Sequence, residues 1–399
     1  MTGKGFRLIF LFVFLFNVFS LSSSDSLEHK SPTSLKAVQV SVLEVRSFAE
    51  LDQWLTELKR AGVNTIILRV FHNPGDRVHQ LCSSSQESGV YFNSQTAPVV
   101  CELLAPVSKR AHQFGLKIYA WMTTRSADYG IKNQELYSWD YDFSSRRYKL
   151  SDRLCLFHPQ VRAYIKRLYQ ELAHYPIDGI LIQDDLMLKH NEDFHPLACS
   201  LYQQEKGAQA HPFLFYQGVK NGKQKFKGYR EEFWDWSQWK AEKLAQFARE
   251  LKNSVKKINP QIKLGMNLYY ETTLKPRYGL AWFSQDLKTL KKAELDFYCL
   301  MLYHRQIKTE LKLNQEELES ALLNSTRYFL EMIPPQESII KLMIKDFKSK
   351  QPIPQSELIR IINLINLPPG AGLAFFPVFE PESQNLKLLF QAWEERGAQ

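Results

Sequence analysis

The chain has 399 residues, of which 44% are hydrophobic and 13% aromatic, enough for the core of one barrel-sized domain or two ordinary domains. Charged residues make up an ordinary 23%, which excludes global disorder. The formal net charge of +9 would suit nucleic acid, anionic lipid or an acidic polysaccharide, but the charge is scattered and singles out none of them.

The N-terminus has the pattern of a secretory signal peptide over residues 1–24. Lys4 and Arg7 precede an apolar run at residues 8–21, and three serines follow it. The run is shorter than the ~20 residues of a membrane span, so a cleaved signal is the prediction and an uncleaved anchor the alternative. A polar linker is expected over residues 25–36. We therefore expect a periplasmic or secreted protein with no integral membrane span after cleavage, and nucleic acid is not an expected partner.

Export implies an oxidising compartment in which cysteines can pair. The chain has five cysteines, so at least one has no partner within it. Cys82 and Cys101 flank one expected loop and form a plausible bridge; the alternative is that most of the cysteines are buried thiols. No Cys/His spacing typical of a metal site occurs, so neither a metal ion nor another cofactor is expected.

Apolar, β-branched runs alternate with segments of helical periodicity along the rest of the chain. A first helix opens after Ser47, which forms a capping-box pattern with Glu50. Further helices are expected at residues 99–114, 161–175, 231–258, 282–293, 315–332, 355–365 and 386–395. Strands are expected at residues 37–45, 65–71, 117–122, 180–183, 263–268, 297–303, 338–344 and 372–379.

Eight strands alternating with helices predict an α/β fold, specifically a (β/α)₈ TIM barrel over residues 37–399. Such barrels typically need ~250 residues. The excess here lies in long loops after strands 2, 3 and 4, which would fall on the face where barrel enzymes carry their active sites. The alternative is a doubly wound open sheet, but no glycine-rich phosphate-binding turn supports it.

The fourth expected strand ends in two adjacent carboxyl groups, those of Asp184 and Asp185. Adjacent strand residues point to opposite faces, so the two can share a site only where the chain turns. Two close carboxyl groups push one pKa upward, as a general acid requires, and hydrolysis of glycosides usually uses two carboxyl groups. The structural alternative is that one Asp caps the next segment or accepts backbone N–H groups. We interpret the pair as catalytic, with a further carboxyl group from Glu192, Asp193 or Glu271.

Aromatic and polar side chains at the other strand ends indicate a carbohydrate site. Sugar rings have apolar C–H faces that rest on aromatic rings, and hydroxyl groups that bond polar side chains. The residues predicted to bind substrate are Trp121, Gln183, His190, Asp193, Asn267, Tyr269, Trp282 and Tyr303.

Several short motifs resemble one family, in the same order along the chain. They are YFNSQTAPV at residues 91–99, KIYAWM at 117–122, FHPQVR at 157–162, DGILIQDD at 178–185, NLY at 267–269, WFSQ at 282–285, MLY at 301–303 and PIP at 352–354. Together they resemble the C-terminal glycoside-hydrolase domains of the PgaB family of poly-β-1,6-N-acetyl-D-glucosamine (PNAG) N-deacetylases.

The resemblance implies a (β/α)₈ barrel that binds, and in some members cleaves, partly de-N-acetylated PNAG during export of biofilm polysaccharide. It marks Asp184 and Asp185 as the acids of the site, and export machinery as a partner. Gln183 stands where the family has a histidine, and His190 where it has an acid. The family's deacetylase domain has no counterpart in the sequence, so deacetylation is not expected.

Two functions follow as hypotheses. One is a glycoside hydrolase that acts on O-glycosyl bonds of a PNAG-type polysaccharide. The alternative is a non-catalytic module on a degenerate barrel that binds or guides such a polysaccharide during export.

Overall fold

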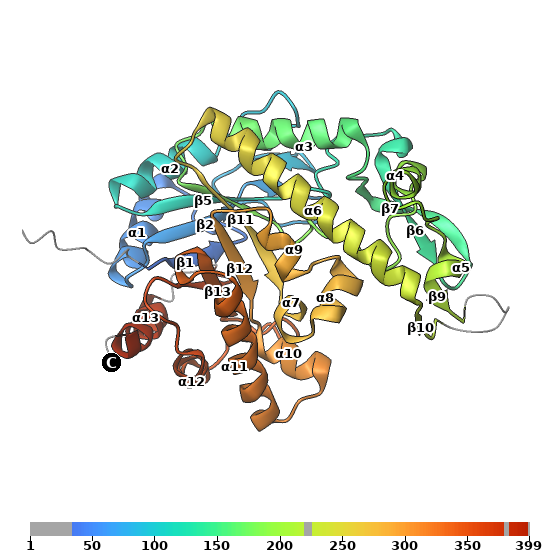
Figure 1. The fold of residues 1–399 in the computed structure, drawn as a ribbon. Coiled ribbons are helices and arrows are strands. Elements are labelled where there is room, and N and C mark those ends of the chain that lie inside the picture. The colour runs from blue at the N-terminus through green and yellow to red at the C-terminus, as the bar shows by residue number, and fades with distance from the viewer. Residues whose placement is uncertain (1–33, 219–225, 379–382, 398–399) are drawn as a thin grey trace, which may run out of the picture. The chain divides into compact units, whose positions relative to one another are not determined.

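The computed structural model describes residues 34–218, 226–378 and 383–397, so the predicted signal peptide and nearly all of the predicted linker lie outside the described residues. Eight parallel strands close into a barrel (Figure 1), which confirms the predicted TIM fold. In barrel order the strands are β1 (Lys36–Val40), β2 (Thr65–Arg69), β5 (Lys117–Met122), β8 (Gly179–Ile182), β11 (Lys263–Tyr269), β12 (Phe297–Met301), β13 (Ser338–Met343) and β14 (Gly372–Phe376), and β14 pairs with β1.

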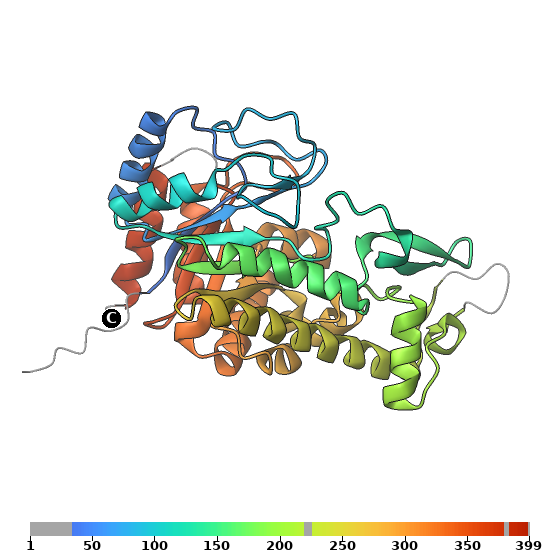
Figure 2. The same ribbon diagram turned by 90° about the horizontal axis from the view of Figure 1, so that it is seen from above.

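Helices surround the barrel (Figures 1 and 2). They are α1 (Phe48–Arg60), α2 (Leu104–Gln113), α3 (Pro159–Leu172), α6 (Glu231–Ile258), α7 (Glu271–Leu274), α8 (Pro276–Phe283), α9 (Leu287–Lys291), α10 (His304–Leu311), α11 (Gln315–Met332), α12 (Gln355–Ile365) and α13 (Ser383–Gly397). The bounds of α6, α11 and α12 are those predicted. Within the described residues, no helix is both long and apolar enough to cross a membrane.

The prediction of one continuous helix at residues 282–293 was wrong. The chain forms α8 and α9 there, because Ser284 adopts the left-handed conformation (φ 50°) that ends α8. Asp286 then caps α9, with its side chain accepting the backbone N–H of Thr289 at 2.9 Å.

Two aromatic rings close the N-terminal end of the barrel. Tyr119 and Phe297 lie with ring centroids 5.4 Å apart. Glycines on neighbouring strands leave room for them, since a Cβ at Gly179 would lie 2.9 Å from the Tyr119 ring and one at Gly265 would lie 2.3 Å from the Phe297 ring. These rings fill the barrel interior at this end.

The three long loops predicted after strands 2, 3 and 4 are present. The first carries β3 (Phe71–His72) and β4 (Gly89–Val90). The second carries the short 3₁₀ helix η1 (Gln134–Leu136) and a hairpin of β6 (Tyr137–Asp142) and β7 (Arg147–Leu154), and the third carries α4 (Pro196–Lys206), α5 (Pro212–Phe215), β9 (Tyr216–Gln217) and β10 (Gly228–Tyr229). A second 3₁₀ helix, η2 (Pro335–Glu337), precedes β13.

The second and third loops pack together beside the barrel, over the N-terminal end of α6 (Figure 2). The ring of Trp139 in β6 meets that of His195 at 6.0 Å. From α6, Trp236 stacks on Phe215 at 5.7 Å and Trp239 stacks on Phe157 at 4.9 Å. This aromatic packing explains why α6 continues for 28 residues, well past the barrel wall.

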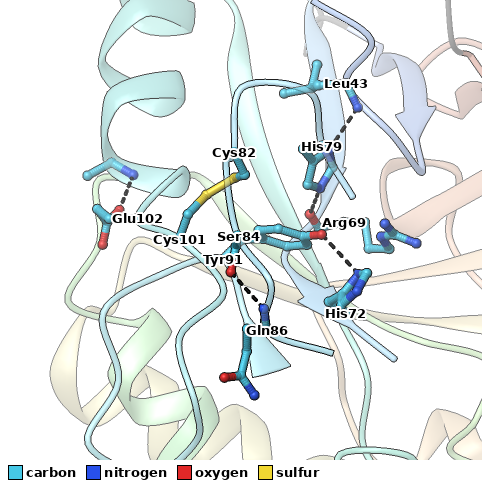
Figure 3. Close-up of a disulfide and its surroundings, with 11 residues drawn as sticks. Leu43, Arg69, His72, His79, Cys82, Ser84, Gln86, Tyr91, Cys101 and Glu102 are labelled. Carbon is cyan, nitrogen blue, oxygen red and sulfur yellow. Dashed lines mark hydrogen bonds between the residues drawn. A yellow bond between two sulfur atoms is a disulfide. The ribbon is translucent and has the colours of Figure 1, made fainter. Parts of the chain in front are cut away.

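A disulfide and a buried histidine fix the first loop (Figure 3). Cys82 and Cys101 are bonded, as one of the two sequence alternatives proposed, while Cys155, Cys199 and Cys299 are free thiols. His79 accepts the backbone N–H of Leu43 on Nδ1 at 2.8 Å, and its Nε2 lies 3.0 Å from the carbonyl of Arg69. One neutral imidazole thus ties the loop to the ends of β1 and β2, and burial lowers the pKa of His79 to about 3.

Candidate active site

A cavity of about 370 Å³ lies at the C-terminal mouth of the barrel. Almost every barrel strand, or the residue that follows it, supplies a side chain to its wall. The lining residues are Gln39, Trp121, Gln183, Asp184, Asn267, Tyr269, Tyr270, Met301, Tyr303, Gln306, Glu310, Lys341, Met343, Phe347 and Phe376. Six of the eleven residues predicted as catalytic or substrate-binding are among them.

Asp184 is the predicted carboxyl group that reaches this cavity. It is the second residue after β8, and the hydroxyl of Tyr269 donates to its Oδ2 at 3.3 Å. Burial raises the pKa of Asp184, and the nearby charge of Asp185 raises it further, whereas Lys341 acts in the opposite direction. A carboxyl group with a raised pKa in a cavity is suited to deliver a proton.

Asp185 points elsewhere and is bonded within the protein. Its two oxygens accept the hydroxyls of Thr123 at 2.7 Å and Thr124 at 2.9 Å, and the backbone N–H groups of Thr124 and Ser126, each at 2.9 Å. These donors all belong to the turn after β5, so Asp185 fixes the start of the second long loop. Its predicted catalytic role stays a prediction, and the geometry favours a positioning role.

A lysine that sequence reasoning did not select forms part of the cavity wall. Lys341 on β13 is fully buried, and its Nζ donates to Oδ1 of Asn267 at 2.6 Å. Asn267 therefore lies in the cavity wall as predicted, and its amide oxygen already accepts a hydrogen bond from Lys341. The sequence offered one sign of this role, because Lys341 is a single lysine inside the apolar run of an expected strand. Gln39 is likewise a single polar residue in the first expected strand.

Aromatic rings form the apolar walls. Trp121 meets Phe376 edge to face at 6.0 Å, and Phe376 stacks on Tyr303 at 6.2 Å. Tyr269 is held in place by Phe283, with the two rings stacked at 3.9 Å. Such faces suit the C–H surfaces of a sugar ring.

Trp282 does not line the cavity. It is 40% exposed on α8, where it stacks on Tyr278 at 4.9 Å. Its predicted contact with substrate would therefore be made outside the cavity, on the surface next to Phe283.

Three polar groups of the wall have no hydrogen-bond partner among the described residues. They are Nε1 of Trp121 and the Oε1 atoms of Gln39 and Gln183. Buried polar groups are normally paired, because an unpaired one loses its hydration without compensation. These groups are candidates to bond a hydroxyl or amide of a ligand.

Glu192 and Asp193 lie outside this cavity in a buried ion cluster. Glu192 is fully buried and accepts from Nη1 of Arg125 at 2.9 Å. Burial alone would raise the pKa of Glu192, but Arg125 outweighs this effect and lowers the pKa to about 2. Lys240 on α6 donates to the backbone carbonyls of Lys189, at 2.8 Å, and Glu192. Asp193 accepts the backbone N–H of His195 at 3.1 Å. Their predicted roles in the site stay predictions, and this geometry gives them a structural role.

His190 packs within the third loop rather than in the cavity. Its Nδ1 lies 3.0 Å from the hydroxyl of Tyr229, its ring meets Phe226 at 5.6 Å, and burial lowers its pKa to about 4. Glu271, also considered as a second carboxyl group, is buried next to the cavity residue Tyr270, and burial raises its pKa to about 7.

A larger cavity of about 660 Å³ lies between the β6–β7 hairpin and the start of α4. None of the residues predicted as catalytic or substrate-binding lines it, whereas Asp184 lies in the smaller one. We therefore place the candidate site at the barrel mouth. In the part of the chain that the structure describes, no cluster of three or more His, Cys, Asp or Glu side chains could hold a metal ion.

Comparisons with known proteins show which proteins the chain is similar to. Over 290 residues the chain is 25% identical to the poly-β-1,6-N-acetyl-D-glucosamine N-deacetylase of Escherichia coli strain K12, which covers 67% of this chain and 38% of that protein. The protein of the same name from Escherichia coli O157:H7 matches equally. The chain thus aligns with well under half the length of these relatives.

Solved structures show the same fold. The PgaB (BpsB) glycoside hydrolase domain from Bordetella bronchiseptica superimposes with a TM-score of 0.70 at 21% identity, covering 90% of this chain and 99% of that domain. A β-galactosidase from G. stearothermophilus gives a TM-score of 0.61 at 12% identity, covering 91% of this chain and 57% of that one. The sequence of residues 45–375 matches GHL13, hypothetical glycosyl hydrolase family 13. This glycoside hydrolase-like barrel, related to PgaB, is therefore a member of hypothetical glycosyl hydrolase family 13.

Proposed function

We propose that this protein binds a poly-β-1,6-linked N-acetylglucosamine-type polysaccharide, including partly de-N-acetylated chains, at the barrel mouth and hydrolyses its glycosidic bonds. The observation that carries the proposal is Asp184, a carboxyl group with a raised pKa in a cavity walled by aromatic rings. The name of the Escherichia coli relative supplies the class of polysaccharide.

In this proposal Asp184 protonates the leaving glycosidic oxygen. The other carboxyl group of the cavity wall is that of Glu310, which accepts from the hydroxyl of Tyr270 at 2.7 Å. Glu310 would either take a proton from the water that attacks the anomeric carbon, or attack that carbon itself to form a glycosyl-enzyme that water then hydrolyses, since the second of two carboxyl groups has one of these tasks in most glycoside hydrolases. Asp185 would hold the turn after β5 in place beside them.

The test is incubation of the protein with β-1,6-linked N-acetylglucosamine oligosaccharides, fully and partly acetylated, followed by mass spectrometry. Asp184→Asn should reduce the release of shorter products by at least ~10³-fold, because an amide cannot supply the proton. Asp235→Asn, the same chemical change on an exposed position of α6, is the matched control and should keep full activity. Unchanged product release by Asp184→Asn would refute the assignment.

A second candidate function is binding without turnover. It is favoured by one observation: of the three residues predicted as catalytic, only Asp184 lines the cavity. This function predicts that oligosaccharides bind, that no shorter products appear, and that Trp121→Ala weakens binding by about tenfold or more. Detection of products from the unmodified protein would exclude it.

We also propose that the protein acts after export, in the periplasm or outside the cell, and that a polysaccharide export machinery delivers its substrate. The basic and apolar pattern of residues 1–24 supports this location. A mature protein from the native host whose N-terminus still carries residues 1–24 would contradict cleavage.

A further inference from the structure

The β6–β7 hairpin lies beside α4, outside the ring of barrel strands (Figure 1), and the described residues cover only one of its two edges. On β6, the backbone N–H of Tyr141 donates to the carbonyl of Asn191 at 2.9 Å. The carbonyl of Trp139 accepts the backbone N–H of Phe194 at 2.8 Å. Both partners belong to the third long loop, which therefore covers the outer edge of β6 and fixes the hairpin in place.

The other edge of the hairpin, formed by β7, has free backbone groups. Trp139 lies opposite Leu150 and Tyr141 lies opposite Tyr148 in the antiparallel pair. Residues directly opposite each other in such a pair turn their N–H and C=O groups either toward each other or both outward. Because Trp139 and Tyr141 bond outward, Tyr148 and Leu150 also point these groups outward, on the far side of β7. In the described part of the chain, these groups of Tyr148 and Leu150 have no hydrogen-bond partner.

The same two residues open onto an apolar cavity. The side chains of Tyr148 and Leu150 are 42% and 45% exposed, and with Trp139 they line the cavity of about 660 Å³. Pro196 and Leu197, at the start of α4, lie in its opposite wall. A strand added to β7 would place every second side chain on this face of the hairpin. Those side chains would enter the cavity, and its lining suits apolar ones.

The opposite face of β7 is basic. Arg147 and Lys149 alternate with Tyr148 and Leu150 and are exposed, and Lys149 forms an ion pair with Asp142. Side chains of an added strand that face these cations should therefore be acidic. A second copy of this chain fits poorly, because joining two β7 edges would set these cations against one another.

We propose that the free edge of β7 binds an extended, acidic segment of a partner polypeptide, which adds to the hairpin as a third strand. Backbone hydrogen bonds to Tyr148 and Leu150 would hold the segment. Apolar side chains at alternate positions would fill the cavity, and the acidic ones between them would face Arg147 and Lys149. The inference does not depend on the proposed function, because this surface lies apart from the barrel mouth.

The first test compares two peptides by fluorescence anisotropy with the full protein. One alternates glutamate and valine, and the other alternates lysine and valine. The glutamate peptide should bind at least ~10-fold more tightly than the lysine peptide. Lys149→Glu should reduce this preference by about tenfold. Lys288→Glu, the same change at an exposed lysine of α9, is the matched control and should leave the preference unchanged.

The second test separates strand addition from binding by side chains alone. Two versions of the glutamate peptide carry N-methyl groups, one on the backbone of every valine and the other on that of every glutamate. Alternate residues of a strand bond to the same neighbour, so one version should bind at least ~10-fold more weakly and the other like the unmodified peptide. Hydrogen exchange at the amides of Tyr148 and Leu150 should slow when the peptide binds, whereas the amide of Lys149, which faces β6, should change little.

Four outcomes would overturn the inference. They are no binding of the glutamate peptide, equal binding of the two unmethylated peptides, equal effects of the two sets of N-methyl groups, and unchanged exchange at Tyr148 and Leu150 in the complex. Self-association of the unmodified protein that the peptide disperses would assign the edge to a second copy of the chain, and would also overturn it.

Discussion

Asp184 and Asp185 are neighbours in sequence, but their carboxyl groups have different surroundings. The chain turns directly after β8, which lets one side chain enter the cavity and sends the other under the turn after β5. Asp184 has the hydroxyl of Tyr269 as a donor at 3.3 Å, and its carboxyl group is destabilised as an anion by burial. Asp185 accepts from hydroxyl and backbone donors at 2.7–2.9 Å. The first arrangement favours chemistry and the second favours structure.

Replacement of each acid by asparagine should separate these roles. In Asp185→Asn, one oxygen becomes an NH₂ group that faces donors, so the free energy of unfolding should fall by about 2–4 kcal/mol. Asp184→Asn should change the free energy of unfolding by less than about 1 kcal/mol. Few hydrogen-bond donors contact this side chain, and burial disfavours its charged form, so little stabilisation is lost. Urea unfolding near pH 7 measures both. Equal losses in the two variants would contradict the division of roles.

At the same scale, sequence reasoning found Asp184 but did not find its neighbours Lys341 and Gln39. Both lie in strands, and in a strand a single polar residue among apolar ones gives no sign of whether it faces the barrel interior or the helices. The positions where polar side chains converge depend on the register between strands, which pairs Lys341 with Met301 of β12 and Ala374 of β14. That register is a property of the closed sheet, not of any local pattern.

At the scale of elements, the barrel and the helices α6, α11 and α12 could be predicted because each is encoded locally. An apolar run or a 3.6-residue period is enough to place them. The internal structure of the third long loop could not be predicted in this way, since its stability comes from contacts between distant aromatic rings, such as Trp236 on Phe215. One local signal was present: a histidine before a proline precedes α3, α4 and α5, and each histidine accepts the first free backbone N–H of its helix.

The buried ion cluster joins the second and third loops, and its loss should be costly. Arg125, after β5, donates to Glu192, after β8, at 2.9 Å and to the backbone carbonyl of Leu154 at 3.0 Å. Arg125→Met leaves the Glu192 carboxylate buried without its partner, so the free energy of unfolding should fall by about 3–5 kcal/mol.

A matched control for that variant is Arg360→Met. Arg360 pairs with Glu319 at 2.9 Å, but its side chain is half exposed, so its loss should cost less than about 1 kcal/mol. Chemical denaturation of both variants gives the comparison. A loss in Arg125→Met no larger than that of the control would show that the cluster does not hold the two loops together.

At the scale of the whole molecule, buried ionisable groups act against each other on stability between about pH 7 and pH 5. His79 has a pKa of about 3 and His190 of about 4, so the unfolded chain binds protons below its own histidine pKa of 6.5 while the folded protein does not. These histidines therefore cost stability as the pH falls. Asp140 and Glu271 have pKa values raised to about 7 by burial, so the folded protein binds their protons first and gains stability over the same range. The two effects oppose each other, so each pair reduces the pH dependence that the other pair would produce alone.

Single substitutions should change the pH dependence of stability in opposite directions. At about pH 5 the loss of stability due to His79 amounts to about 2 kcal/mol, because this pH lies about 1.5 units below the pKa of 6.5 in the unfolded chain. The gain due to Glu271 amounts to about 2–3 kcal/mol, because this pH lies about 2 units below its pKa of about 7 in the folded protein. Compared with the unmodified protein, His79→Gln should therefore gain stability as the pH falls from about 7 to about 5, and Glu271→Gln should lose stability over the same range. Urea unfolding at both pH values measures the slopes, and His174→Gln, a change at an exposed histidine, is the control that should keep the slope of the unmodified protein. Parallel curves for His79→Gln and the unmodified protein would mean that His79 accepts a proton in the fold, and that the bonds from Leu43 and to Arg69 do not hold it neutral.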